Sequence, residues 1–146
     1  MIIRDPSPED QTAWKRLWSA YNAFYNAAIP DVVTQQTWRR ILDPNSAIFA
    51  RLAENHGDVV GFSVSVLHES TWTAEPICYL EDLFVDPISR RQGAGRLLIQ
   101  DLVDRARSRR WSRLYWHTRA DNPARALYDE FATADDFVRY RLLFDQ

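Results

Sequence analysis

The stretch LEDLFVDPISRRQGAGRLL, residues 80–98, decides the fold. An apolar strand ends at Val85, a turn with Gly93 and Gly95 follows, and a helical pattern begins. Glycine lets the backbone approach a ligand closely, and the first turn of a helix has free N–H groups and a partial positive charge. Positive side chains flank the turn on both sides: Arg90, Arg91 and Arg96. The stretch therefore predicts a site for a phosphate or pyrophosphate.

Two other phosphate-binding motifs do not fit this turn. The Rossmann pattern needs a third glycine at position 98, where this chain has Leu98, and the P-loop needs a Gly-Lys-Ser/Thr run, which is absent. A Gly-x-Gly pattern alone would also fit a helix that begins with glycines beside solvated arginines. The strand–turn–helix context and the arginines on both sides favour the phosphate site.

Hydrophobic periodicity predicts alternating strands and helices in the rest of the chain. Helices are expected from Ser7-Pro8 to Pro30, over Val33–Leu42 and Gly95–Arg109, and from Asn122 to about Phe131. Strands are expected at Ile2–Arg4, Ala47–Leu52, Val59–Leu67, Ile77–Val85, Arg113–Thr118 and Phe137–Phe144. The order β-α-α-β-β-β-α-β-α-β predicts one domain over residues 1–146. Its class is α/β, at the border with α+β, with a mixed central sheet of about six or seven strands and helices on both faces.

Composition limits the kinds of partner. The chain is 46% hydrophobic and 26% charged, and its net charge of −2 suits a cationic substrate better than nucleic acid. No apolar run approaches the roughly 18 residues of a membrane span, so no membrane partner is expected. The single cysteine, Cys78, fits a reducing compartment, and we expect a cytoplasmic protein. The three histidines lack metal-ligand spacing, so no metal is expected.

The glycine turn resembles the signature of the GCN5-related N-acetyltransferases (GNAT). Arg90-x-x-Gly93-x-Gly95 is similar to the family's Gln/Arg-x-x-Gly-x-Gly/Ala, and residues 83–87 are similar to its usual strand end. The order of elements is similar over nearly the whole chain. The resemblance implies an acetyl-CoA-dependent N-acetyltransferase. It also implies that two central parallel strands, Ile77–Val85 and Arg113–Thr118, splay apart to admit the cofactor.

The same resemblance assigns a cofactor site, with acetyl-CoA as the cosubstrate. Backbone amides from Arg90 to Arg96 would hold the pyrophosphate, and the backbone of Leu83 to Val85 would pair with the pantetheine arm like an extra strand. The expected cofactor-binding residues are Leu83, Phe84, Val85, Arg90, Arg91, Gln92, Gly93, Ala94, Gly95, Arg96 and Asn122.

A second motif, NPARALY at residues 122–128, resembles the family's Asn-x-x-Ala-x-x-Leu-Tyr helix. Asn122 could be a plain helix N-cap, a role compatible with a cofactor contact. Tyr128 could be a core tyrosine, but with both motifs present we predict a general acid, because a phenol of pKa about 10 can protonate a thiolate. The family usually continues with a short Gly-Phe turn, whereas residues 129–136 contain no glycine. In this the chain resembles a branch related to a fungal histone and polyamine acetyltransferase.

The pair Glu81-Asp82 interrupts an otherwise apolar strand. Freeing a lysine-type amine of its proton at pH 7 costs roughly 4.6 kcal/mol, so a nearby carboxylate would assist. Strand alternation predicts opposite faces for the two acids, unless a bulge intervenes. Pairing with arginines is the structural alternative. We expect Glu81 to be the base, because polyamine-type relatives carry a Glu-Asp pair here; Asp82, a water chain and His117 are alternatives.

The aromatic residues Trp14, Trp18, Tyr21 and Tyr25 share a helix face. They could form a cage for a cationic amine, but helical spacing favours a place in the core.

The sequence thus predicts acetyl transfer from acetyl-CoA to a primary amine, either a small cationic, polyamine-like molecule or a lysine-like side chain. A protein N-terminus or histone tail is the rival acceptor. A non-catalytic CoA-binding module and a nucleotide-binding protein of another kind are the rival classes. The resemblance leaves a homodimer open, because the family often dimerises.

Overall fold

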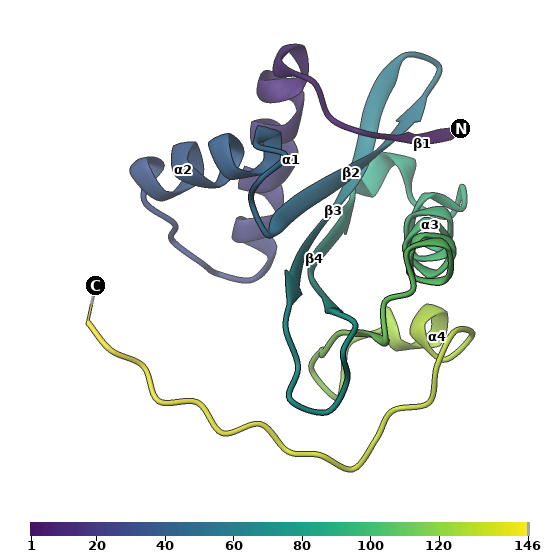
Figure 1. Ribbon diagram of the computed structural model, residues 1–146. Coiled ribbons are helices and arrows are strands. Elements are labelled where there is room, and N and C mark those ends of the chain that lie inside the picture. The colour runs from purple at the N-terminus through teal and green to yellow at the C-terminus, as the bar shows by residue number, and fades with distance from the viewer. Residues whose placement is uncertain (146) are drawn as a thin grey trace.

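The central sheet has five strands in the order β1-β2-β3-β4-β5 (Figure 1). The computed structural model describes residues 1–145. Strands β1 to β4 pair antiparallel with their neighbours, and β5 pairs parallel to β4. The strands are β1 (Ile2–Arg4), β2 (Ile48–Asn55), β3 (Asp58–His68), β4 (Ile77–Val85) and β5 (Arg113–Tyr115). The mixed sheet is the predicted one, although it has fewer than the expected six or seven strands.

Helices lie on both faces of the sheet, as predicted: α1 and α2 on one, α3 and α4 on the other (Figure 1). The helices are α1 (Gln11–Phe24), α2 (Asp31–Leu42), α3 (Ala94–Arg109) and α4 (Arg125–Tyr128). Two 3₁₀ turns, η1 (Pro8–Asp10) and η2 (Pro87–Ser89), precede α1 and the glycine turn. Among residues 1–145, no helix has both the length and the apolar character that crossing a membrane requires.

Strands β2 and β3 form the expected hairpin. Asn55 lies opposite Asp58, so the loop consists of His56 and Gly57. Both have positive φ, 51° and 86°, which is the backbone that matches the twist of a two-residue hairpin.

Two apolar layers hold the helices on the sheet. The larger layer, under α1 and α2, centres on the fully buried Trp14, whose ring stacks on Trp18 at 5.1 Å and on Trp38 at 5.2 Å between centroids. The core placement predicted for Trp14 and Trp18 is confirmed. The smaller layer packs Ala94 and Leu98 of α3 against the other face.

A buried ion pair also ties the sheet to α3. The Arg51 guanidinium, on β2, donates to both carboxylate oxygens of Asp101 at 2.9 Å, and it contacts Asp5 as well. The Arg51 side chain is 9% exposed and that of Asp101 is 16% exposed. Removing one partner would therefore leave a charge away from water.

The C-terminal part of the chain corrects the sequence prediction. Residues 137–144 are extended but pair with no strand of the sheet, so the expected final strand is absent among the described residues. An extended, alternating segment becomes a strand only when a neighbour accepts its hydrogen bonds, and alternation does not specify that neighbour. The expected strand at 113–118 ends at Tyr115, and the helix expected over 122–131 is regular only in α4.

Candidate active site

The parallel strands β4 and β5 separate after three residue pairs. Pairing runs from Ile77 opposite Arg113 to Tyr79 opposite Tyr115, whereas β4 continues to Val85. Residues 80–85 of β4 therefore have an open edge, as the resemblance implied.

The backbone of this open edge faces the gap. The amide of Asp86 donates to Val60 O, on β3, at 2.8 Å. Because backbone groups alternate in direction along an antiparallel strand, those of Leu83 and Val85 point away from β3. The Val85 carbonyl accordingly accepts a hydrogen bond from Arg90 Nε at 3.1 Å on that side.

The turn between β4 and α3 presents a row of unpaired amides. Arg91 and Gly93 have positive φ, 65° and 88°, and Gly93 is the N-cap of α3. The first bond that continues into the helix is Leu97 N to Gly93 O, at 3.0 Å. Within the described chain, the amides of residues 91–96 donate to no protein acceptor. Such a row, at the positive end of a helix, fits an anion with several oxygens.

Gly95 lets α3 approach its neighbours. A Cβ at this position would lie 3.2 Å from Leu127 Cδ2 of α4 and 3.8 Å from Val85 Cγ2 of β4. The second glycine of the motif thus serves close packing, whereas Gly93 serves the positive φ, with nothing within 4 Å of an added Cβ.

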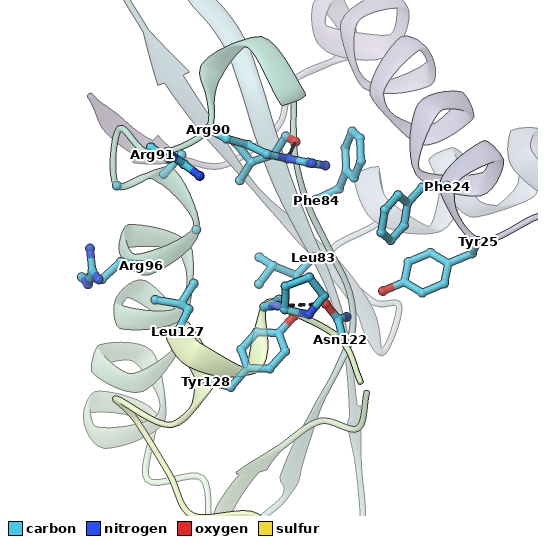
Figure 2. Close-up of a pocket in the computed structure, with 16 residues that line it drawn as sticks. Phe24, Tyr25, Leu83, Phe84, Arg90, Arg91, Arg96, Asn122, Leu127 and Tyr128 are labelled. Atoms are coloured by element: carbon cyan, nitrogen blue, oxygen red, sulfur yellow. Dashed lines mark hydrogen bonds between the residues drawn. The ribbon is translucent and has the colours of Figure 1, made fainter. Parts of the chain in front are cut away.

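A cavity of about 530 Å³ joins these elements (Figure 2). Ten of the eleven residues expected to bind the cofactor line it, together with Tyr128: Leu83, Phe84, Val85, Arg90, Arg91, Gly93, Ala94, Gly95, Arg96 and Asn122. Gln92 does not, because its side chain accepts a hydrogen bond from Asn55 Nδ2 at 3.3 Å, in the β2–β3 hairpin. Glu81, the expected base, is also absent from the lining.

The three arginines of the motif have different surroundings. Arg90 lies over the Phe84 ring, 5.6 Å from its centroid, and bonds Val85. Arg96 pairs with both oxygens of Glu130, at 3.1 and 2.8 Å, on the rim of the cavity. Arg91 has no ion pair within the described chain. Arg90 likewise has no carboxylate partner there, so among the three side chains only the charge of Arg96 is balanced by an acidic group.

Asn122 holds the turn into α4. Its Nδ2 donates to Thr118 Oγ1 at 2.8 Å, and its Oδ1 accepts from the amide of Ala124 at 2.9 Å. The N-cap of α4 is Ala124, so the capping role considered for Asn122 is wrong; its side chain instead bonds the turn before the helix, and it also lines the cavity.

Tyr128 projects from α4 with its hydroxyl toward the cavity (Figure 2). Its ring packs edge-on against Trp116, 5.7 Å between centroids, and its hydroxyl has no hydrogen-bond partner within the described chain. Burial, and to a lesser extent Tyr25, raise the pKa of Tyr128. The phenol thus keeps its proton at neutral pH.

Tyr25 is a site residue that the sequence analysis placed in the core, with an amine cage as the alternative. It follows the end of α1, and Figure 2 shows its hydroxyl directed into the cavity opposite Tyr128. Helical spacing assigned it to the core with Trp14 and Trp18, but it is 37% exposed. Tyr25 lies just past the last turn of α1, and this position distinguishes it from the buried residues on the core face of the helix.

A β-bulge brings Glu81 and Asp82 together. Asp82 lies opposite Val64 and Leu80 opposite Ser65, so Glu81 is an extra residue in β4. The Glu81 charge acts on the phenol of Tyr79 and on Asp82. The bulge interrupts the strict alternation on which the expected opposite faces rested, as the sequence analysis allowed.

Asp82 is the more unusual of the two acids. Burial raises its pKa to about 7; the nearby Tyr21 hydroxyl opposes the rise and the Glu81 charge adds to it. Tyr21 in turn contacts Tyr25, 5.0 Å between ring centroids. Asp82 is thus connected to the cavity through two tyrosines at the end of α1, Tyr21 and Tyr25.

A cluster of tyrosine and histidine side chains lies beside the two acids, on β4 and on β5 and the residues that follow it. Tyr79 stacks on Tyr115 at 5.0 Å, and its hydroxyl lies 2.9 Å from His117 Nε2. Among residues 1–145, no three His, Cys, Asp or Glu side chains gather in a group that could hold a metal ion. The contact with Tyr79 makes His117 part of an aromatic cluster.

A mixed sheet whose parallel strands part beside a glycine turn with unpaired amides agrees with the fold that the motif resemblance implied. The chain matches the acetyltransferase (GNAT) family over residues 11–132, and it belongs to that family. It is thus an N-acetyltransferase, as the resemblance of its motifs implied, and this family uses acetyl-CoA as the acetyl donor.

Relatives of known sequence and structure are similar over nearly their whole lengths. The chain is 31% identical over 144 residues to the D-amino-acid N-acetyltransferase HPA3 of Saccharomyces cerevisiae, covering 97% of this chain and 89% of that protein. It is 30% identical over 145 residues to the uncharacterized N-acetyltransferase YhfO of Bacillus subtilis, covering 97% of each. The crystal structure of a probable acetyltransferase superposes with a TM-score of 0.88 at 22% identity, covering 100% of this chain and 99% of that one.

Proposed function

We propose that this enzyme acetylates the primary amine of a small cationic acceptor, with acetyl-CoA lying along the open edge of β4. The observation that carries the proposal is the row of unpaired amides at residues 91–96, which opens into the same cavity as Tyr128. These amides and Arg91 would hold the pyrophosphate. The outward backbone of Leu83 and Val85 would bond the pantetheine arm, in the place of a neighbouring strand.

Two side chains would move protons. When bound, acetyl-CoA supplies an activated thioester. Glu81, exposed at the bulge, would take the proton of the acceptor amine through water, because it does not line the cavity itself. Tyr128 would give its proton to the departing sulfur, since burial keeps the phenol protonated.

The acids at the bulge support a cationic acceptor. Glu81 and Asp82 place up to two negative charges beside the α1 end of the cavity, and Asp82 gains its charge near pH 7. A polyamine-like molecule or a lysine-like side chain would be attracted to this end. A protein N-terminus would carry a single positive charge and would gain less.

An adjoining hollow favours a second acceptor class. It is lined by Phe24, Tyr25, Asn26, Arg119, Asp121, Asn122 and Pro123. Arg119 and Asp121 offer opposite charges, which would suit the zwitterion of a free amino acid. The name of the HPA3 relative, a D-amino-acid N-acetyltransferase, agrees with this class.

Thiol release from acetyl-CoA in the presence of single amines tests both candidates. The panel contains a polyamine, an aminoglycoside, a lysine peptide, and D- and L-amino acids. Turnover on the polyamine or the lysine peptide is the expected result, and turnover confined to amino acids would establish the second class. Stabilisation by CoA without turnover on any amine would contradict the proposal.

A further inference from the structure

The side chain of Arg90 lies on the open edge of β4. Its Nε donates to the Val85 carbonyl at 3.1 Å, and its guanidinium carbon lies over the Phe84 ring, 5.6 Å from the centroid. Figure 2 shows this side chain directed toward Phe84, whereas Arg91 and Arg96 lie on the side of α3. Of the three cations beside the glycine turn, Arg90 is thus the one that reaches back onto the strand.

The carbonyl that Arg90 occupies belongs to the edge that lies open to a ligand. Pairing between β4 and β5 ends at Tyr79 opposite Tyr115, and the Val85 carbonyl points away from β3. Under the proposed function, this edge would bond the pantetheine arm in the place of a neighbouring strand. The Arg90 side chain and the pantetheine arm therefore compete for the same backbone acceptor.

The contacts of Arg90 are few and lie at the surface. The residue is exposed, and within the described chain Nε is the only one of its donors that has an acceptor. Hydrogen bonds from an ionised donor are stronger than those from a neutral amide, and they are stronger again when the acceptor is also ionised. A phosphate would therefore outcompete the Val85 carbonyl for this guanidinium, whereas an uncharged amide would not displace it.

The place for a phosphate lies next to Arg90 in the chain. The amides of residues 91–96 donate to no acceptor within the described chain, and Arg90 lines the same cavity as this turn. The guanidinium has no carboxylate partner there that would hold it back. Once an anion with several oxygens occupies the turn, the Arg90 side chain can leave Val85 and still be paired.

We propose that Arg90 determines donor specificity, because it covers the Val85 carbonyl in the free enzyme and leaves it only for a donor that carries phosphate groups. The inference rests on the proposed function, in which the pantetheine arm lies along β4. The diphosphate of the donor would attract the guanidinium toward the turn, and this movement would free the carbonyl for the arm. A short acetyl thioester without phosphates would find the carbonyl covered, so the enzyme would discriminate against it.

A purely structural role for Arg90 predicts a different result. If its bond to Val85 only kept the turn in shape, removal of the guanidinium would weaken every donor. If the bond covers the donor site, removal of the guanidinium would weaken a donor with phosphates and improve a donor without them. The two roles therefore differ in the sign of the effect on a short thioester.

Acetyl transfer from two donors tests the proposal: acetyl-CoA, and S-acetylpantetheine, which has the same arm and no phosphate. Arg90→Met removes the guanidinium and keeps an apolar side chain beside Phe84. This variant is expected to lower kcat/KM for acetyl-CoA about tenfold. It is expected to raise kcat/KM for S-acetylpantetheine about fivefold, the net worth of one hydrogen bond. The matched control Arg91→Met is expected to weaken acetyl-CoA and to bring no gain with the short donor.

Binding measured without an acceptor amine separates this inference from the proposed function. Among the NMR signals of arginine Nε–H groups, the one that disappears in Arg90→Met belongs to Arg90. CoA is expected to shift this signal, and pantetheine, at the KM of its acetyl thioester, is expected to leave it in place. Calorimetry is expected to show weaker CoA binding to Arg90→Met than to the wild type.

The outcomes can be told apart. CoA binding that shifts the Arg90 signal, without turnover on any amine, would contradict the proposed function and leave the competition at Val85 standing. Three results would each overturn the role of Arg90: no gain with S-acetylpantetheine in Arg90→Met, an equal gain in Arg91→Met, or an Arg90 signal that CoA does not shift.

Discussion

Replacing Asp82 by asparagine should remove a specific pH dependence from the stability of this enzyme. Burial raises the pKa of this carboxyl from 3.8 to about 7 in the folded chain. Between these two values the folded chain keeps the proton and the unfolded chain has lost it. The contribution of Asp82 to stability is therefore fully present below pH 3.8, declines as the pH rises, and is lost above about pH 7.

The magnitude follows from the size of the shift. A change of about three pH units, at about 1.4 kcal/mol per unit, gives a ceiling of about 4 kcal/mol. Asp82 is partly exposed and the Tyr21 hydroxyl lies nearby, so we expect about 1–3 kcal/mol of unfolding free energy to disappear between pH 4 and pH 7.

Urea unfolding at pH 4.5, 6 and 8 measures this effect in the wild type and in Asp82→Asn. Asparagine can still accept a hydrogen bond from Tyr21 but cannot ionise, so the variant should gain stability relative to the wild type as the pH rises. Glu81→Gln, at the exposed neighbour, is the matched control and should follow the wild type. A constant difference between the wild type and Asp82→Asn at all three pH values would refute the reasoning.

Three further changes test the site and the fold. Tyr128→Phe should lower kcat by about 10²-fold, typical of a lost general acid, with little effect on acetyl-CoA affinity; equal loss of both in steady-state kinetics would count against its role. Gly93→Ala and Gly57→Ala should each cost about 1 kcal/mol, because both positions have positive φ with open space around an added Cβ, but calorimetry should show weaker CoA binding only for Gly93→Ala. Asp101→Asn should cost about 3 kcal/mol in urea unfolding, because the buried Arg51 loses its main partner; a loss below about 1 kcal/mol would show that water reaches it.

The cofactor side of the site could be predicted from the sequence because its chemistry is local. The glycine turn, the strand before it and the helix after it lie within residues 80–98, and their geometry depends on no distant contact. The exception is Gln92, which turns away because Asn55 of the hairpin donates a hydrogen bond to its side chain, a tertiary contact that the local sequence does not specify.

The acceptor side could not be predicted in the same way. The bulge at Glu81 depends on the register between β3 and β4, which two alternating patterns do not fix to a single residue. Tyr25 belongs to the apolar pattern of α1, yet the end of the helix carries it past the core and into the cavity. The prediction of a final strand at residues 137–144 was wrong for a related reason. An alternating pattern indicates a strand but does not specify the edge on which it would pair.

The early parting of β4 and β5 leaves an edge of β4 that, under the proposed function, the acetyl donor would complete. Only three residue pairs join β5 to β4 among the described residues. The backbone groups along the rest of this edge of β4 are therefore available to a ligand in the gap. At a hundred times its dissociation constant, a ligand that binds only the folded chain adds about 2.7 kcal/mol to stability. If the donor binds in this gap as proposed, acetyl-CoA above its dissociation constant is expected to protect the folded enzyme from proteolysis.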